Sequence, residues 1–141
     1  MKILLVLLCA LLSVANAFGA TLKRLADCYI KPCEIHGDFD GDGKADSAVL
    51  VKSSDGKKGI RIKLANGKVF FVGSGNPTGS GGDDFSWMDK WSLTTGPILQ
   101  GAGEEPPPKA PGDHLLVERT EAASGMLYWN GSKFDWYQQG D

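Results

Sequence analysis

The feature that most constrains this chain of 141 residues is an acidic loop, DFDGDGKAD, at positions 38–46. Carboxylates occupy loop positions one, three, five and nine, and a glycine occupies position six. Alternating oxygen ligands suit a hard cation such as calcium, and the glycine permits a tight curl that a Cβ atom would oppose. We therefore predict a calcium site whose ligands are the side chains of Asp38, Asp40, Asp42 and Asp46 and the backbone carbonyl of Lys44.

The segments on either side of this loop are typical of β-strands. Residues 33–36 lead into it, and a β-rich run at 47–52 leaves it. Loop position twelve, where a helix-loop-helix hand places a bidentate glutamate, is Val49. The loop therefore joins two strands, and water or a neighbouring segment must complete the ligand shell. We expect a structural ion that clamps a small domain, not a calcium sensor.

The N-terminus has the layout of a secretory signal at residues 1–17. Lys2 supplies the positive charge, an apolar run follows to Val14, and Ala15-Asn16-Ala17 forms a small-x-small cleavage site. The apolar run is short for a bilayer span, so a retained anchor is the lesser alternative. We predict an exported, periplasmic product with a single β domain at residues 18–141.

Removal of residues 1–17 changes both the charge and the cysteine count. It takes away Lys2 and no acid, so the formal net charge falls from −2 to −3. This acidic balance argues against nucleic acid or an anionic membrane as a partner. Cys9 also leaves, and we expect Cys28 and Cys33 to form a structural disulfide in an oxidising compartment. A redox-active pair is the alternative, although the spacing is not Cys-x-x-Cys.

Two hairpin signals follow the acidic loop. Asp55-Gly56 and Asn66-Gly67 favour type I′ turns, and they separate three β-rich runs. Residues 60–64 alternate apolar and basic side chains, as in a strand with one face in water. We predict an antiparallel meander over residues 49–72.

Two irregular stretches interrupt the strands. Residues 73–82 contain five glycines and no apolar anchor, which predicts a long mobile loop that does not pack. Residues 101–112 include three consecutive prolines, and a polyproline-like segment of this kind projects or braces without ladder hydrogen bonds.

The remaining segments predict further strands. Residues 85–93 place three aromatic side chains and a leucine on one parity, which favours a core strand. Residues 114–119 form another strand, and an aromatic hairpin with an Asn130-Gly131 turn closes the chain. We predict an all-β domain of mostly antiparallel sheet, as a meander or sandwich or as a propeller-like fragment, with long loops.

Residues 36–50 resemble the calcium loop of FG-GAP repeats, the integrin-like propeller motif. That motif reads Gly-Asp-Phe-x-Gly-Asp-Gly-x-x-Asp before a strand, and residues 37–46 match it. The resemblance implies calcium binding by the loop. It does not imply a whole propeller, because a propeller needs several blades and the motif occurs once.

The sequence gives little support to catalysis. His36 and His114 are the only histidines, and no serine has a Gly-x-Ser-x-Gly setting. The acid pairs Glu104-Glu105 and Glu118 with Glu121 are better explained as solvated surface than as a glycosidase pair. We therefore interpret the chain as a binding protein and not as an enzyme.

The overall layout is similar to that of periplasmic immunity proteins of type VI secretion, in particular small calcium-binding inhibitors of muramidase effectors. The similarity rests on the exported β domain, the single acidic loop and the aromatic stretch at residues 128–137. It implies a cognate peptidoglycan hydrolase as partner, whose glycan groove is occluded by an acidic or glycine-rich loop. The candidate contact residues are Asn76, Ser80, Asp83, Asp84, Glu104 and Glu105.

Two alternatives remain open. A calcium-stabilised carbohydrate or cell-surface binding module would use Trp87, Trp91, Trp129 and Trp136 as stacking platforms, and some of them would then be exposed in a row. A small hydrolase would depend on one of the acidic pairs.

Overall fold

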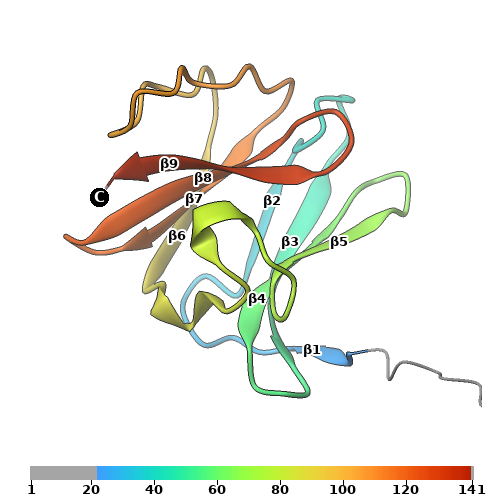
Figure 1. Cartoon of the computed structure of the whole chain (residues 1–141). Coiled ribbons are helices and arrows are strands. Elements are labelled where there is room, and N and C mark those ends of the chain that lie inside the picture. Colours follow the sequence, from blue (N-terminus) through green and yellow to red (C-terminus); the bar gives the residue numbers. More distant parts are fainter. Residues whose placement is uncertain (1–21, 141) are drawn as a thin grey trace, which may run out of the picture.

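The computed structural model describes residues 22–140, and the predicted signal at residues 1–17 with its cleavage site lies outside this range. Within the range, regular structure consists of nine β-strands and two short 3-10 helices (Figure 1). None of these helices is long and apolar enough to cross a membrane. The prediction of an all-β, antiparallel fold is confirmed.

The first sheet contains the meander that the turn signals predict. Its strands are β1 (Arg24–Ala26), β2 (Glu34–Gly37), β3 (Asp46–Ser53), β4 (Lys58–Lys63) and β5 (Val69–Gly73). β3, β4 and β5 are consecutive antiparallel neighbours. The opposite edge of β3 is shared, because β2 pairs with its first half and β1 with its second half. The disulfide between Cys28 and Cys33 links the two ends of the connection from β1 to β2, as predicted.

The second sheet has four antiparallel strands in sequence order. They are β6 (Lys90–Thr94), β7 (His114–Arg119), β8 (Ala123–Trp129) and β9 (Phe134–Gly140). The predicted turn before β9 is held by Asn130, whose Oδ1 accepts hydrogen bonds from the N–H groups of Ser132 and Lys133 at 2.9 and 3.0 Å. An asparagine side chain that bonds to the backbone ahead of it favours a tight turn.

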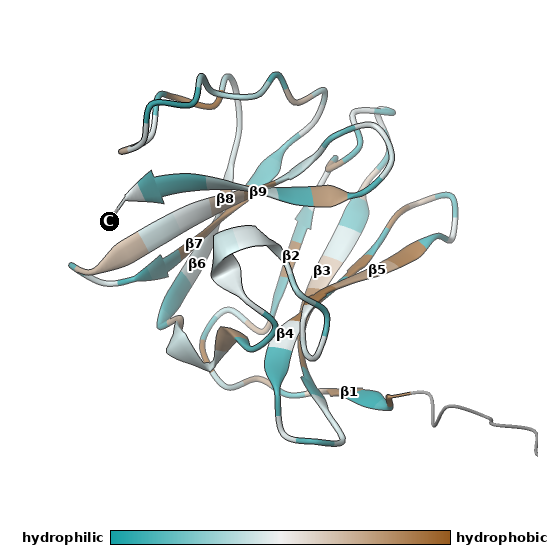
Figure 2. Ribbon diagram, in the orientation of Figure 1, coloured by the Kyte–Doolittle hydropathy of each residue, from teal (hydrophilic) through white to brown (hydrophobic). Residues whose placement is uncertain are grey.

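The two sheets share one hydrophobic core, so the arrangement is the two-sheet form of the predicted fold. The buried side chains that build it from both sheets include Leu50, Ile60, Ile62, Trp91, Leu115, Val117 and Leu127. In β4 the isoleucines are buried while the intervening Arg61 faces outward, which confirms the alternation in the sequence. Figure 2 shows β5 as hydrophobic and the C-terminal part of β9 as hydrophilic.

Residues 85–93 do not form the single strand that their parity predicts. They begin with η2 (Phe85–Trp87), and β6 starts only at Lys90. The carboxylate of Asp84 accepts a hydrogen bond from the Ser86 N–H at 3.0 Å, and this cap favours a helical turn over an extended chain. Trp91, at 2% exposure, lies in the core as predicted.

Residues 73–82 are packed, which contradicts the predicted mobile loop. They include η1 (Gly79–Gly81), and a Cβ atom added at its first or last residue would lie 2.7 or 2.8 Å from the side chain of Trp136. Thr78 beside them is only 6% exposed. The glycines therefore permit close approach to an indole ring that is distant in sequence, rather than flexibility.

Candidate functional site

Three carboxylates converge in the loop between β2 and β3. Asp38, Asp40 and Asp42 each offer one oxygen atom, and these atoms lie within 4.8 Å of one another. Gly43, at loop position six, has a φ of +83°, a conformation that L side chains rarely adopt. The loop thus curls as its sequence predicts and brings together three of the four predicted carboxylates.

Backbone N–H groups hold this curl from inside the loop. The N–H of Gly43 donates to Asp38 Oδ2 and the N–H of Lys44 donates to Asp42 Oδ1, both at 2.8 Å. The second oxygen of Asp38, Oδ1, is buried and has no hydrogen-bond partner among the described residues. A buried carboxylate oxygen without a donor is destabilising unless a cation meets it.

Asp46, the fourth predicted carboxylate, lies outside this group of three. It is 2% exposed, and its two oxygens accept hydrogen bonds from the N–H groups of Phe39 and Ala65, each at 2.8 Å. Both oxygens therefore serve the fold, because they tie the start of the loop to the turn between β4 and β5.

The residues present fit a calcium ion. The pKa of Asp40 is raised above its ordinary value, because burial disfavours its charged form and the carboxylates of Asp46 and Asp42 add negative charge nearby. A divalent cation would relieve this repulsion, and carboxylate oxygens are the ligands that calcium prefers. Asp38, Asp40 and Asp42 could hold the ion through their side chains.

Residues 95–113, which we call the arm, connect β6 to β7 across the outer face of the second sheet (Figure 1). Beneath the arm lies a second hydrophobic cluster, in which Ile98 packs with Met126 of β8 and Tyr137 of β9. Ala110, from the other end of the arm, packs against the same cluster. The predicted polyproline-like segment therefore braces the sheet.

The middle of the arm carries two exposed glutamates, Glu104 and Glu105, which we call the acidic tip. The hydroxyl of Tyr137 accepts a hydrogen bond from the Gly101 N–H at 3.0 Å and donates one to the Glu105 carbonyl at 2.8 Å. Gln100 Nε2 also donates to the Glu105 carbonyl, at 2.8 Å. The backbone of the acidic tip is thus held in place while its side chains face solvent.

The arm and the acidic loop meet backbone to backbone. The N–H of Asp38 donates to Asp113 Oδ2 at 2.9 Å, and the N–H of Asp113 returns a bond to the Asp38 carbonyl at 2.8 Å. A Cβ atom added at Gly41 would lie 2.5 Å from the Pro111 carbonyl oxygen. This close contact joins the base of the arm to the first position of the loop.

The other four candidate contact residues lie in or after the glycine-rich loop: Asn76, Ser80, Asp83 and Asp84. The first two are exposed. The last two are engaged within the chain, because Asp83 forms an ion pair with Lys57 at 2.5 Å and Asp84 accepts a hydrogen bond from the Lys58 N–H at 3.0 Å. Burial acts to raise the pKa of Asp84, but its hydrogen bonds outweigh this effect and leave the pKa lowered.

The four tryptophans do not form an exposed row within residues 22–140. Trp91 is buried, and the other three are half-buried in aromatic clusters. Trp87 meets Trp136 edge to face with ring centres 5.9 Å apart, and Trp129 meets Phe70 at 5.2 Å. These tryptophans pack against the core, and the sequence pattern of residues 85–93 favoured this role for Trp87 and Trp91.

Three of the residues weighed for a hydrolase, Glu118, His114 and His36, have other partners. Glu118 lies 3.8 Å from the ammonium of Lys90, and His114 is buried with its Nε2 2.7 Å from the Gly96 carbonyl. His36 lies on the surface beside Glu34, at 3.3 Å.

The fold and site thus define a two-sheet antiparallel β protein with a candidate calcium loop and a braced acidic arm. Comparison with protein-family models, curated proteins and solved structures finds no match to this chain. The resemblance of residues 36–50 to FG-GAP loops, and of the whole to immunity proteins, therefore stays a prediction.

Proposed function

We propose that this protein is a periplasmic inhibitor that binds a peptidoglycan-degrading enzyme of the muramidase or lysozyme type. The acidic tip of the arm would occlude the glycan groove of that enzyme, and a calcium ion in the acidic loop would stabilise the fold. The observation that carries the proposal is the tip itself, two adjacent exposed glutamates on a braced segment. The resemblance of the sequence layout to type VI immunity proteins supports the choice of partner.

The bracing of the tip favours binding. Tyr137 and Gln100 hold the backbone at Glu105, and the N–H of Ala102 donates to the Gln139 carbonyl of β9 at 2.9 Å. A loop that is ordered before association loses less conformational entropy when it binds. An inhibitor that fills a cleft gains affinity from such pre-organisation.

Charge complementarity favours a cell-wall enzyme. Peptidoglycan carries carboxylates on its peptides, so cationic side chains at an enzyme groove would favour its binding. An exposed pair of glutamates on a protein of formal net charge −2 is attracted to such a groove. Opposite charges also speed diffusional encounter between the two proteins.

An apolar anchor lies on the same arm. Leu99 is 74% exposed, the most exposed of the large hydrophobic side chains in the described range. Interfaces draw most of their energy from a few large side chains surrounded by a polar rim. Leu99 and the acidic tip together would supply that combination.

The calcium ion would act at the base of the arm. Asp38 is both a candidate ligand and the residue whose backbone bonds to Asp113. Binding of an ion to the folded state alone stabilises that state by mass action. The ion would therefore hold the acidic loop and the arm in one arrangement.

The partner can be identified by affinity capture. The mature chain, residues 18–141, is immobilised and exposed to a lysate of cells that encode it, and retained proteins are assayed for peptidoglycan cleavage. The E104K/E105K variant serves as the matched control. Retention of a peptidoglycan hydrolase by the native chain, and its loss with the variant, supports the proposal. A retained partner without cell-wall activity overturns it.

A further inference from the structure

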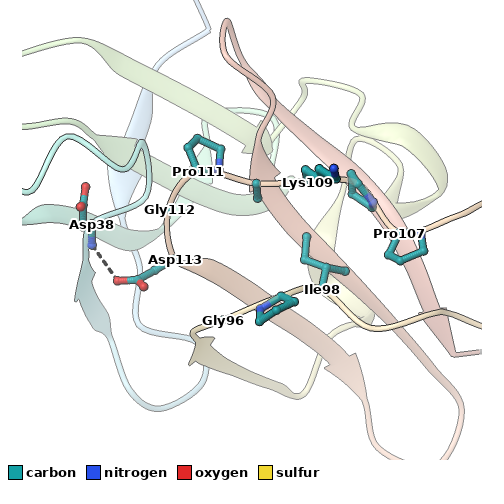
Figure 3. Close-up of a pocket in the computed structure, with 11 residues that line it drawn as sticks. Asp38, Gly96, Ile98, Pro107, Lys109, Pro111, Gly112 and Asp113 are labelled. Carbon is teal, nitrogen blue, oxygen red and sulfur yellow. Dashed lines mark hydrogen bonds between the residues drawn. The ribbon is translucent and has the colours of Figure 1, made fainter.

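A groove of about 650 Å³ lies between the two extended parts of the arm (Figure 3). One wall is formed by residues 96–98 and the other by the proline-rich stretch 107–112. Ile98 is 5% exposed and packs with Met126 and Tyr137, so this wall is anchored to the second sheet. The volume falls within the range of about 300–1,000 Å³ that is typical of ligand sites.

The carboxylate of Asp113 supplies negative charge at one end of this groove. Asp38 and Asp113 both line it there, joined by the hydrogen bond from the Asp38 N–H (Figure 3). The remaining lining is glycine, alanine, proline and isoleucine, apart from the exposed Lys109 on the arm. Negative charge at the end of an apolar groove favours a ligand with an apolar body and a cationic end.

We propose that the groove receives a basic side chain, arginine or lysine, which an apolar loop of the partner enzyme carries, and that Asp113 pairs with its charge. The identity of the partner rests on the proposed function, because the same arm carries the acidic tip. This second acidic contact, at the base of the arm, and the tip in its middle would together fix the orientation of the enzyme on the arm.

Asp113 and Lys109 of the lining make opposite predictions. Asp113 attracts a bound cation, so its neutralisation weakens binding. Lys109 repels it, so neutralisation of this exposed ammonium strengthens binding. A merely structural role of the groove would not give effects of opposite sign, and Lys109 is exposed, so its replacement leaves the fold intact.

Short peptides test the groove without the enzyme. The probes are acetyl-Leu-Arg-Leu-amide and the same peptide with citrulline, the uncharged isostere of arginine, titrated into isotopically labelled protein. Amide chemical shifts report both the location and the dissociation constant. We expect the arginine peptide to shift the amide signals of the non-proline lining residues of the arm, which are Gly96, Ile98, Lys109, Ala110, Gly112 and Asp113. We also expect it to bind about threefold or more tightly than the citrulline peptide.

Variants sharpen the same titration. D113N should weaken the arginine peptide about threefold, and K109Q should strengthen it about twofold. D113N retains an oxygen that can accept the Asp38 N–H, and K109Q remains informative even if D113N fails to fold. Equal affinity for arginine and citrulline, shifts outside the groove, or an unchanged K109Q would overturn the proposal.

A cell-wall ligand is the alternative occupant, and the same titration tests it. A soluble disaccharide-tetrapeptide fragment of peptidoglycan carries its own free amine and serves as the probe. Tighter binding of this fragment than of the arginine peptide would overturn a protein partner in the groove. The peptide titration does not involve the enzyme. It can therefore refute cation binding in the groove without refuting enzyme inhibition by the acidic tip.

Discussion

The hydroxyl of Tyr137 donates a hydrogen bond to the backbone carbonyl of Glu105 at 2.8 Å, so a side chain of β9 positions the acidic tip. The preceding residue, Trp136, packs against the glycine-rich loop instead. Successive side chains of a strand point to opposite faces. β9 therefore supports the arm on one face through Tyr137 and the glycine-rich loop on the other face through Trp136.

Replacement of Tyr137 by phenylalanine should loosen the arm without removing the ring from the cluster below it. The variant loses the bonds to Gly101 and Glu105, which costs about 1–2 kcal/mol of unfolding free energy. Limited proteolysis should then cut within residues 99–106 faster than in the native chain. Tyr128→Phe, at a half-buried tyrosine that packs against the same cluster, is the control. Equal cleavage of the two variants would contradict the bracing role.

Gly125→Ala tests the packing of Trp136. A Cβ atom at residue 125 would lie 1.9 Å from the indole, so the ring must shift from its position against the glycines of η1. Overpacking of this kind lowers the unfolding free energy by about 1–3 kcal/mol. Urea denaturation measures the loss. Gly103→Ala, where no atom lies within 4 Å, should be nearly neutral, and similar losses for both variants would refute the packing argument.

Calcium should raise the melting temperature of the native chain, and chelation should lower it. At a calcium concentration about a hundredfold above the dissociation constant, the gain in unfolding free energy is about 2.7 kcal/mol. Asp40→Ala removes one of the three converging carboxylates and should abolish most of the response. Glu121→Ala, an exposed acid elsewhere, should keep it. Calorimetry with and without chelator decides, and a native chain indifferent to chelation rules out a stabilising ion.

Asp84 should contribute to acid unfolding. Its folded pKa is lowered from the ordinary value of 3.8 by hydrogen bonds from Ser86 and Lys58 that outweigh the opposing effect of burial. A depressed carboxyl pKa contributes stability that is present above pH 3.8 and is lost as the pH falls through the folded pKa. Asp84→Asn should flatten the dependence of unfolding free energy on pH below about 4. An unchanged slope would show that protonation of Asp84 does not contribute to acid unfolding.

The local signals predicted most of the fold. Alternation in residues 60–64 and the Asn-Gly and Asp-Gly turns predicted the meander, since they act within a few residues. Processing and spacing together predicted the disulfide from Cys28 to Cys33.

The failure at the glycine-rich loop comes from a contact between distant residues. A glycine-rich sequence looks the same whether its glycines provide backbone flexibility or allow another side chain to pack closely. In residues 73–82 they allow close packing of Trp136, which lies far along the chain. For residues 85–93 the apolar parity predicted a strand, whereas the carboxylate of Asp84 caps a helical turn at their start. At the candidate site, the spacing of the loop predicted the convergence of Asp38, Asp40 and Asp42. The roles of Tyr137 and Asp113 had no local signal, because both act on residues more than thirty positions away.

Enzyme inhibition tests the central claim most directly. The mature chain is titrated against the captured peptidoglycan hydrolase, and the rate of cell-wall clearing is recorded. The control is E34K/E121K, which makes the same change in charge at two other exposed glutamates. If the acidic tip occludes the groove, the native chain and the control inhibit at a one-to-one ratio, whereas E104K/E105K loses inhibition by at least about tenfold, or 1.4 kcal/mol. Equal inhibition by E104K/E105K and the native chain would contradict this claim.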